Sequence, residues 1–211
     1  MVLGIRWLIF LFGIMAFSLG VSMSINMQHL GIHPWDVLNV VLYEKLGLSI
    51  GSWAIIISIL LIGVSWILDK SYIKLGTFFN AILVGIFVDI YLLLDFLPTA
   101  SYTWMDYVWM VIGIMIMGVG GGVYNAANVG SGPRDGFMLS ISDKLSASVG
   151  KVRIITETFV LLIGLILGGP VFLFTFVFTF IQSPIFQFTY GRLRAKVMKL
   201  ETGYIENKAR A

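Results

Sequence analysis

The chain reads GIHPWDVLNVVLYEKLGLSIG at residues 31–51 and GSGPRDGFMLSISDKLSASVG at residues 130–150. At a constant offset of 99 positions, seven of these 21 residues are identical without a gap. The identical pairs are Gly31 and Gly130, Pro34 and Pro133, Asp36 and Asp135, Lys45 and Lys144, Leu46 and Leu145, Ser49 and Ser148, and Gly51 and Gly150. Downstream, Thr77-Phe78 matches Thr175-Phe176. This pattern predicts that the chain is an internal duplication.

The composition excludes an ordinary water-soluble domain. Hydrophobic residues make up 58% of the 211 residues and charged residues only 12%, whereas a soluble domain has about a quarter of its residues charged. The mean hydropathy is +0.95. The chain has no cysteine, which excludes disulfides, thiolate metal sites and a cysteine nucleophile. These values predict a multi-pass protein embedded in the lipid bilayer.

Six apolar segments are long enough to cross most of a bilayer core, which takes about 20 helical residues. They are residues 7–27, 52–68, 76–97, 106–126, 151–168 and 170–190. The last segment alternates phenylalanine with other residues, but the intervening residues are uncharged, so a helix surrounded by apolar neighbours is favoured over a strand.

Lysine and arginine placement predicts the orientation of these segments. With the amino terminus inside the cell, 13 of the 14 basic residues lie on the inner side, and only Lys45 lies outside. Both termini are therefore expected to be cytoplasmic. The residues that follow the sixth segment, 192–211, are expected to form a basic cytoplasmic tail that contacts anionic lipid rather than nucleic acid.

The duplication and the topology together predict an all-α integral membrane fold of two inverted three-span repeats, at residues 1–100 and 101–191. An odd number of spans places the second repeat upside down relative to the first. Inverted repeats of this kind are typical of transporters and channels, whose sites lie near the midplane where the halves meet. Fold alone does not fix function.

Each repeat contains a Gly-x-x-Pro-x-Asp segment between its first and second spans. Pro34 and Pro133 suit the first turn of a helix. These helices would end near Leu46 and Leu145, and about 12 residues are too few to cross a bilayer. Two placements stay open. The segments are either re-entrant half-helices whose amino termini meet at the midplane, shaped by glycines at Gly31, Gly130 and Gly132, or amphipathic helices on the membrane surface. Trp35 and Arg134 at equivalent positions favour the surface placement.

Five polar residues are candidates for a substrate or ion path. Asp36 and Asp135 fall in the first turns of the short helices, where a carboxylate either caps the helix or binds a cation or proton. Asp89 lies inside the third span, where an ionisable residue is a functional candidate by default. Asn125 and Asn128 either line the path or join helices.

Other polar and small residues have structural interpretations. Glu157 lies four residues after Arg153, which favours an ion pair along one helix face. Gly118 and Gly122 indicate close helix packing rather than a nucleotide loop. His29, His33 and Asp36 have ligand-like spacing, but no further strong ligand lies nearby in the sequence, so no metal site is expected.

Known catalytic motifs are absent, so we expect neither an enzyme nor a cofactor. The favoured function is a small-solute transporter or channel-like protein. The alternatives are a non-transporting accessory protein that binds a protein partner or a second copy of the chain, and the substrate-binding subunit of a multi-component transporter.

The Gly-x-x-Pro-x-Asp segments at 31–36 and 130–135, the Gly-Thr-Phe at 76–78 and the six-span duplication resemble the YczE/YyaS/YitT family of bacterial membrane proteins, and the YczE-like branch in particular. The resemblance covers about residues 5–195 and implies a bacterial plasma-membrane protein without implying a substrate. The second repeat has Phe174 where the first has Gly76, and Ser183 where the first has Gly85. We therefore expect the sixth span to pack more loosely than the third.

Overall fold

A computed structural model describes residues 2–94 and 96–210, with side chains described at 3–94 and 96–200. Every regular element within these ranges is a helix. In chain order they are α1 (Val2–Asn26), η1 (Gln28–Leu30), α2 (Pro34–Leu46), α3 (Ile50–Leu68), η2 (Lys70–Tyr72), α4 (Leu75–Leu93), α5 (Trp104–Ala126), α6 (Pro133–Leu145), α7 (Val149–Ile166) and α8 (Leu173–Arg210).

The eight α-helices form two sets of four in the same order, α1–α4 and α5–α8. The second helix of each set, α2 or α6, has 13 residues and begins at proline. Proline suits this position because its fixed φ is helical and its missing N–H would have no partner there. The residue that follows α2 is Gly47 with φ +76, and the residue that follows α6 is Ser146 with φ +48. The predicted short helices, with ends at Leu46 and Leu145, are confirmed.

Four of the described helices are long and apolar enough to cross a membrane: α1, α3, α4 and α5. α7 and α8 coincide with the two remaining predicted segments. α7 carries three charged residues, and α8 has polar residues and Pro184 in its middle. The chain is therefore an α-helical membrane protein. α8 also continues as one helix through residues 192–210, which were expected to form a separate tail.

The centre of the fold is the contact between α1 and α5, the first helices of the two sets. It brings the two backbones together at glycines. A Cβ atom built on Gly120 would lie 2.3 Å from the Phe17 nitrogen, and one on Gly13 would lie 2.4 Å from the Tyr124 nitrogen. Only glycine permits such an approach. Gly118 and Gly122 instead face α8, against Ile185 and Thr189 side-chain atoms among others.

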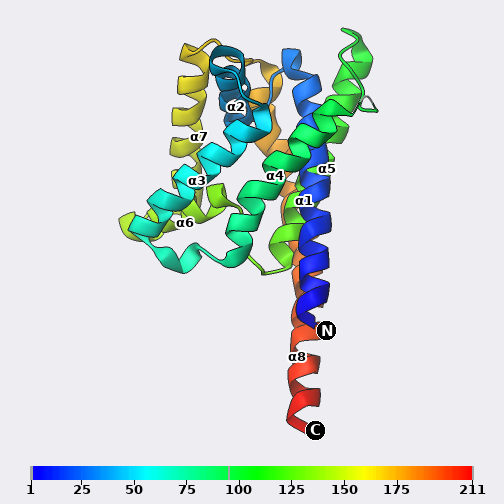
Figure 1. Cartoon of the computed structure of the whole chain (residues 1–211), viewed down its shortest axis with the longest axis vertical. Coiled ribbons are helices and arrows are strands. Elements are labelled where there is room, and N and C mark those ends of the chain that lie inside the picture. The colour runs from blue at the N-terminus through cyan, green and yellow to red at the C-terminus, as the bar shows by residue number, and fades with distance from the viewer. Residues whose placement is uncertain (1, 95, 211) are drawn as a thin grey trace.

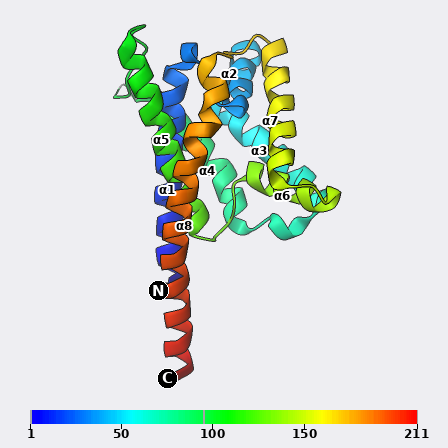
Figure 2. The same ribbon diagram turned by 180° about the vertical axis from the view of Figure 1, so that it is seen from behind.

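The second and third helices pack crosswise between the two sets, whereas the fourth helix of each set packs on the first helix of its own set. α2 contacts α7 and α3 contacts α6, so the short helix of each set lies on the third helix of the other. α4 packs on α1, and α8 packs on α5. Figures 1 and 2 show α2 at one end of the molecule and α6 toward the other, with both chain termini at the end nearer α6.

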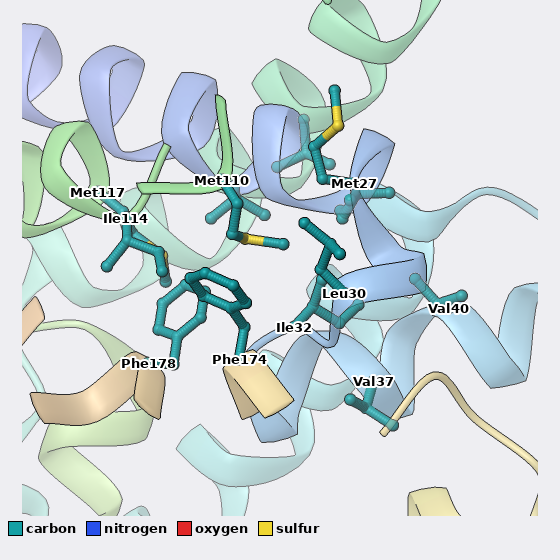
Figure 3. Close-up of a cluster of buried hydrophobic side chains, with 13 residues drawn as sticks. Met27, Leu30, Ile32, Val37, Val40, Met110, Ile114, Met117, Phe174 and Phe178 are labelled. Carbon is teal, nitrogen blue, oxygen red and sulfur yellow. The ribbon is translucent and has the colours of Figure 1, made fainter. Parts of the chain in front are cut away.

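The turn that leads into α2 is buried in the apolar core rather than on the surface. Figure 3 shows Met27 and Ile32 packed with methionines of α5 and with Phe174 and Phe178 of α8. Gly31 has φ +96, and a Cβ built there would lie 2.7 Å from Thr175 Oγ1. The position therefore requires glycine on both conformational and steric grounds.

The equivalent turn before α6 makes the equivalent contact with the other set. A Cβ on Gly130 would lie 2.4 Å from the Thr77 nitrogen, and Thr77 is the sequence match of Thr175. The glycine of each Gly-x-x-Pro-x-Asp segment thus rests on the beginning of the last helix of the other set. The two sets of helices therefore contact each other reciprocally at these two glycines.

The two sets differ where the third and fourth helices meet. α3 packs closely on α4, and a Cβ on Gly51 would lie 2.1 Å from the Gly85 carbonyl oxygen. α7 and α8 barely touch each other in the described ranges. Gly150, the match of Gly51, has open space beside it, and its counterpart across the gap is Ser183 instead of glycine. The looser packing expected for the last span is found on its α7 side, whereas α8 packs well on α5.

Candidate functional site

A cavity of about 350 Å³ lies where the amino termini of α2 and α6 approach each other. All eight α-helices contribute to its wall. The side of the wall where α7 and α8 stand apart is formed by Gly150, Arg153 and Glu157 of α7 and by Gln182 and Ser183 of α8. This volume lies within the range of small-molecule sites.

The first turn of α2 is buried and carries a histidine cap. His33 Nδ1 accepts a 3.4 Å hydrogen bond from the Trp35 backbone N–H. The His33 ring also lies edge-on to Phe178, with centroids 5.3 Å apart. Its Nε2 lies 3.8 Å from Glu157 Oε1 on α7. The cap therefore serves the helix and also brings an acidic residue of the other set to the cavity.

An ion pair joins the two short helices. Arg134 Nη2 donates to Asp36 Oδ1 at 3.3 Å, and the guanidinium lies 5.3 Å from the centroid of the Trp35 ring. Asp36 is almost fully buried, with 3% of its surface exposed. Its Oδ2 has no hydrogen-bond partner among the described residues. Buried charges are expected to be paired, and Arg134 pairs Asp36 across the two sets.

Asp135 takes a different partner from its sequence match. Its Oδ1 accepts from Arg153 Nη2 of α7 at 3.3 Å. The predicted pair between Arg153 and Glu157 is therefore replaced. Arg153 reaches Asp135 on α6, and Glu157 lies nearest His33 on α2. Helical spacing alone favours a pair between neighbours on the same helix. Because α7 packs against both short helices, Arg153 instead pairs with a residue of α6 and Glu157 lies nearest a residue of α2.

The other predicted path residues lie outside this cavity wall. Asp89 accepts hydrogen bonds from Ser49 Oγ and from the Gly51 N–H, the latter at 2.8 Å, and thus caps the start of α3. It borders a second cavity of about 580 Å³ near Gln28 and Tyr43. Asp89 therefore joins α4 to the start of α3.

The two asparagines lie near the end of α5. Asn125 Nδ2 donates to the Gly121 carbonyl at 3.0 Å. Asn128, in a left-handed conformation after α5, accepts from Lys74 Nζ at 3.3 Å through its side chain and from Arg6 through its carbonyl. Asn128 thus links the end of α5 to Arg6 of α1 and to Lys74 before α4, and it does not line the cavity.

Several polar residues of the wall, among them Trp35, Asn80, Arg134, Arg153 and Glu157, are not among the residues predicted for the path. Trp35 is 3% exposed and Asn80 is 4% exposed, and Trp35 Nε1 and Asn80 Nδ2 have no hydrogen-bond partner among the described residues. Both residues lie in the cavity wall. A buried N–H without a partner costs about 1–3 kcal/mol. In the sequence Trp35 favours a surface placement of its helix, whereas the structure buries it in the cavity wall.

A contact outside the spans also joins the two sets. The Tyr72 hydroxyl of η2 hydrogen-bonds Asp143 near the end of α6, and this bond raises the pKa of Tyr72 above its usual value. Nearby, the Ser71 N–H donates to Asp69, which lowers the pKa of Asp69. The Tyr72 contact fixes the turn between α3 and α4 against α6, and the Ser71 contact closes that turn locally.

Sequence comparisons place the chain among bacterial membrane proteins. A family model described as "Family of unknown function (DUF6198)" matches residues 4–191. The Bacillus subtilis protein named "Uncharacterized membrane protein YczE" is 34% identical over 167 residues, which cover 79% of this chain and 77% of that protein. A Haemophilus influenzae protein is 32% identical over 180 residues, 85% of this chain and 81% of its own length.

A third relative is "Uncharacterized protein YyaS" of Bacillus subtilis, 30% identical over 162 residues that cover 75% of this chain and 79% of that protein. No solved structure matches the chain. The relatives thus extend over most of the chain, and the residues that form the cavity fall inside the matched range.

Proposed function

We propose that this member of the DUF6198 family, to which YczE and YyaS are related, is a transporter of a small polar solute. In this proposal the protein has six spans, namely α1, α3, α4, α5, α7 and α8. α2 and α6 are half-helices that enter the membrane from opposite sides. The two sets of four helices are then inverted repeats, and the cavity between them is the solute site.

The burial pattern of the short helices supports this placement. The residues from Pro34 to Val37 at the start of α2 are buried, whereas the residues from Tyr43 to Leu46 at its end are exposed. α6 is likewise covered at Pro133 and Gly136 and exposed at its last three residues, 143–145. Irregular backbone within a membrane must be buried in protein or line a water-filled cavity. Helices lying on the surface would instead expose one face along their whole length.

The charged residues of the cavity support a polar pathway. Arg134, Arg153, Asp135 and Glu157 all border it. Ionisable side chains cost about 2.5–3.5 kcal/mol each at the centre of a span and mark substrate or ion paths when they occur there. A purely structural bundle would fill this position with apolar side chains at lower cost.

The difference between the two sets supports alternating access. α3 is held against α4 by the contact of Gly51 with Gly85 and by Asp89, at the end far from the termini. α7 and α8 stand apart at the end near the termini, beside Gly150 and Ser183. In this proposal the termini are cytoplasmic, and the gap between α7 and α8 is the cytoplasmic entrance of an inward-open state. In the outward-open state the two sets exchange these arrangements, so that α7 closes on α8.

The single observation that carries the proposal is the cavity lined by both sets of helices at the amino termini of α2 and α6. The test is uptake of a panel of labelled polar solutes into liposomes that contain the purified protein. At least one solute should enter in a saturable way. Ser183→Trp should abolish this uptake because its side chain fills the gap between α7 and α8. Ile155→Trp, on an exposed face of α7, should leave it unchanged.

Two results would contradict the proposal. One is that no solute enters faster than into empty liposomes. The other is uptake that persists in the Ser183→Trp protein. The accessory-protein alternative predicts the first result together with copurification of a specific protein partner.

A further inference from the structure

We infer that the cavity binds a small zwitterion of the α-amino acid type, with the ammonium group at Glu157 and the carboxylate between the arginines and the amino termini of the short helices. This inference deepens the proposed transport function and rests on it. It follows from the arrangement of the charged groups in the cavity wall and from the hydrogen bonds that these groups still lack.

The cavity wall carries charges of both signs. It contains two guanidiniums, Arg134 and Arg153, and two carboxylates, Asp135 and Glu157, and Asp36 adds a third carboxylate beside Arg134. Buried charges are expected to be paired. A solute that carries both an ammonium and a carboxylate group can pair with wall groups of both signs.

Each charge retains capacity for a ligand. A structural pair between arginine and a carboxylate is often bidentate, yet Arg134 and Arg153 each make one hydrogen bond to their carboxylate, at 3.3 Å. Glu157 approaches His33 Nε2 at 3.8 Å, beyond hydrogen-bonding distance. The Arg153 and Glu157 side chains are 39% and 16% exposed. The cavity thus offers a cation and an anion on one face of α7.

The carboxylate end of the ligand has further donors. The amino termini of α2 and α6 carry positive partial charge toward the cavity. Beside them, Trp35 Nε1 and Asn80 Nδ2 are buried donors without a partner. A carboxylate supplies the acceptor oxygens that these groups lack. An amine without a carboxylate would leave all of them unsatisfied.

The apolar part of the cavity wall suits the side chain of an amino acid. Phe17, Met117 and Phe186 contribute apolar surface to the cavity. A volume of about 350 Å³ accommodates a small solute but not a lipid or a peptide chain. An amino acid with a modest apolar side chain therefore matches both the polar and the apolar parts of the wall.

The test measures binding to the purified protein in lipid nanodiscs by calorimetry. The probes are glycine, L-serine, L-leucine and L-glutamine, and the two analogues of leucine that lack one charge, isocaproate and isopentylamine. At least one amino acid should bind. If leucine is that ligand, it should bind about tenfold or more tightly than either analogue, because each analogue loses a charge-assisted contact.

Variants of α7 separate the two ends of the ligand. Glu157→Gln should remove the preference for leucine over isocaproate, and Arg153→Gln should remove the preference over isopentylamine. The matched controls are Glu44→Gln and Lys144→Gln, which change exposed charges away from the cavity and should bind as the unaltered protein does. Because each variant retains one preference, a folded protein is verified in the same titration.

The inference is overturned if none of the amino acids binds, or if isocaproate binds as tightly as leucine. If another class of solute shows uptake that Ser183→Trp abolishes, the transport proposal stands and the zwitterion inference falls. If leucine binds but no uptake depends on Ser183, the transport proposal falls and the assignment of the ligand stands.

Discussion

Replacing Gly120 with leucine should prevent the protein from folding. A Cβ atom at this position would lie 2.3 Å from the Phe17 nitrogen and 2.8 Å from the Gly13 carbonyl oxygen. These are backbone atoms, so no side-chain rotation can relieve the clash, and α1 would have to move away from α5. Overpacking costs about 1–3 kcal/mol where side chains can adjust. We expect a larger loss here, comparable with the entire stability of a typical protein, about 5–15 kcal/mol.

The measurement is the yield of monodisperse protein after detergent extraction, followed by thermal unfolding of what remains. Gly4→Leu is the matched control because a Cβ atom built on Gly4 of α1 meets no atom within 4 Å. The control should purify and unfold as the unaltered protein does. A Gly120→Leu protein that elutes and melts normally would contradict the close contact of α1 with α5.

The second large effect concerns the ion pair between the short helices. Arg134→Gln should lower the free energy of unfolding by about 3–5 kcal/mol, because it leaves the buried Asp36 carboxylate without its cation. The double variant Asp36→Asn/Arg134→Gln should recover most of this loss, since it removes both charges and keeps polar side chains of similar size.

The comparison is a double-mutant cycle from unfolding measurements in one detergent. The loss of the Arg134 contact with the Trp35 ring occurs in the single and the double variant, so it does not affect the difference between them. Equal stability of the two variants would show that Asp36 does not depend on Arg134. In that case the pairing across the two sets would not explain why Asp36 is buried.

The duplication in the sequence predicts much of the fold. Matches at Gly31 and Gly130 and at Pro34 and Pro133 indicate two equivalent short helices, and the structure contains both with the expected ends. The same matches also indicate that glycine is required at both positions, although they do not show which residue each glycine contacts. In each case the neighbour is a residue of the other set, Thr175 for Gly31 and Thr77 for Gly130.

The pairing of charges is less predictable because it depends on contacts between the two sets. Helical spacing favours Arg153 with Glu157, but the structure places Asp135 beside Arg153 and His33 beside Glu157. Asp89 in an apolar helix resembles a path residue, and only the position of the Gly51 N–H shows that it caps α3. Trp35 and Asn80 become candidate site residues only when their unpaired N–H groups are seen in the cavity wall.

Accessibility of a single cysteine at Ser183 tests the central claim most directly, because the chain has no cysteine of its own. Ser183→Cys protein in sealed vesicles is treated with a membrane-impermeant thiol reagent from one side at a time. Ser71→Cys in η2 and Ser101→Cys between α4 and α5 report the two faces, since both positions are exposed in loops at opposite ends of α4. We predict that Ser183→Cys reacts from the Ser71 face and is protected from the Ser101 face. Reaction from the Ser101 face, or from neither face, would contradict a water-filled cavity that opens between α7 and α8 toward the termini.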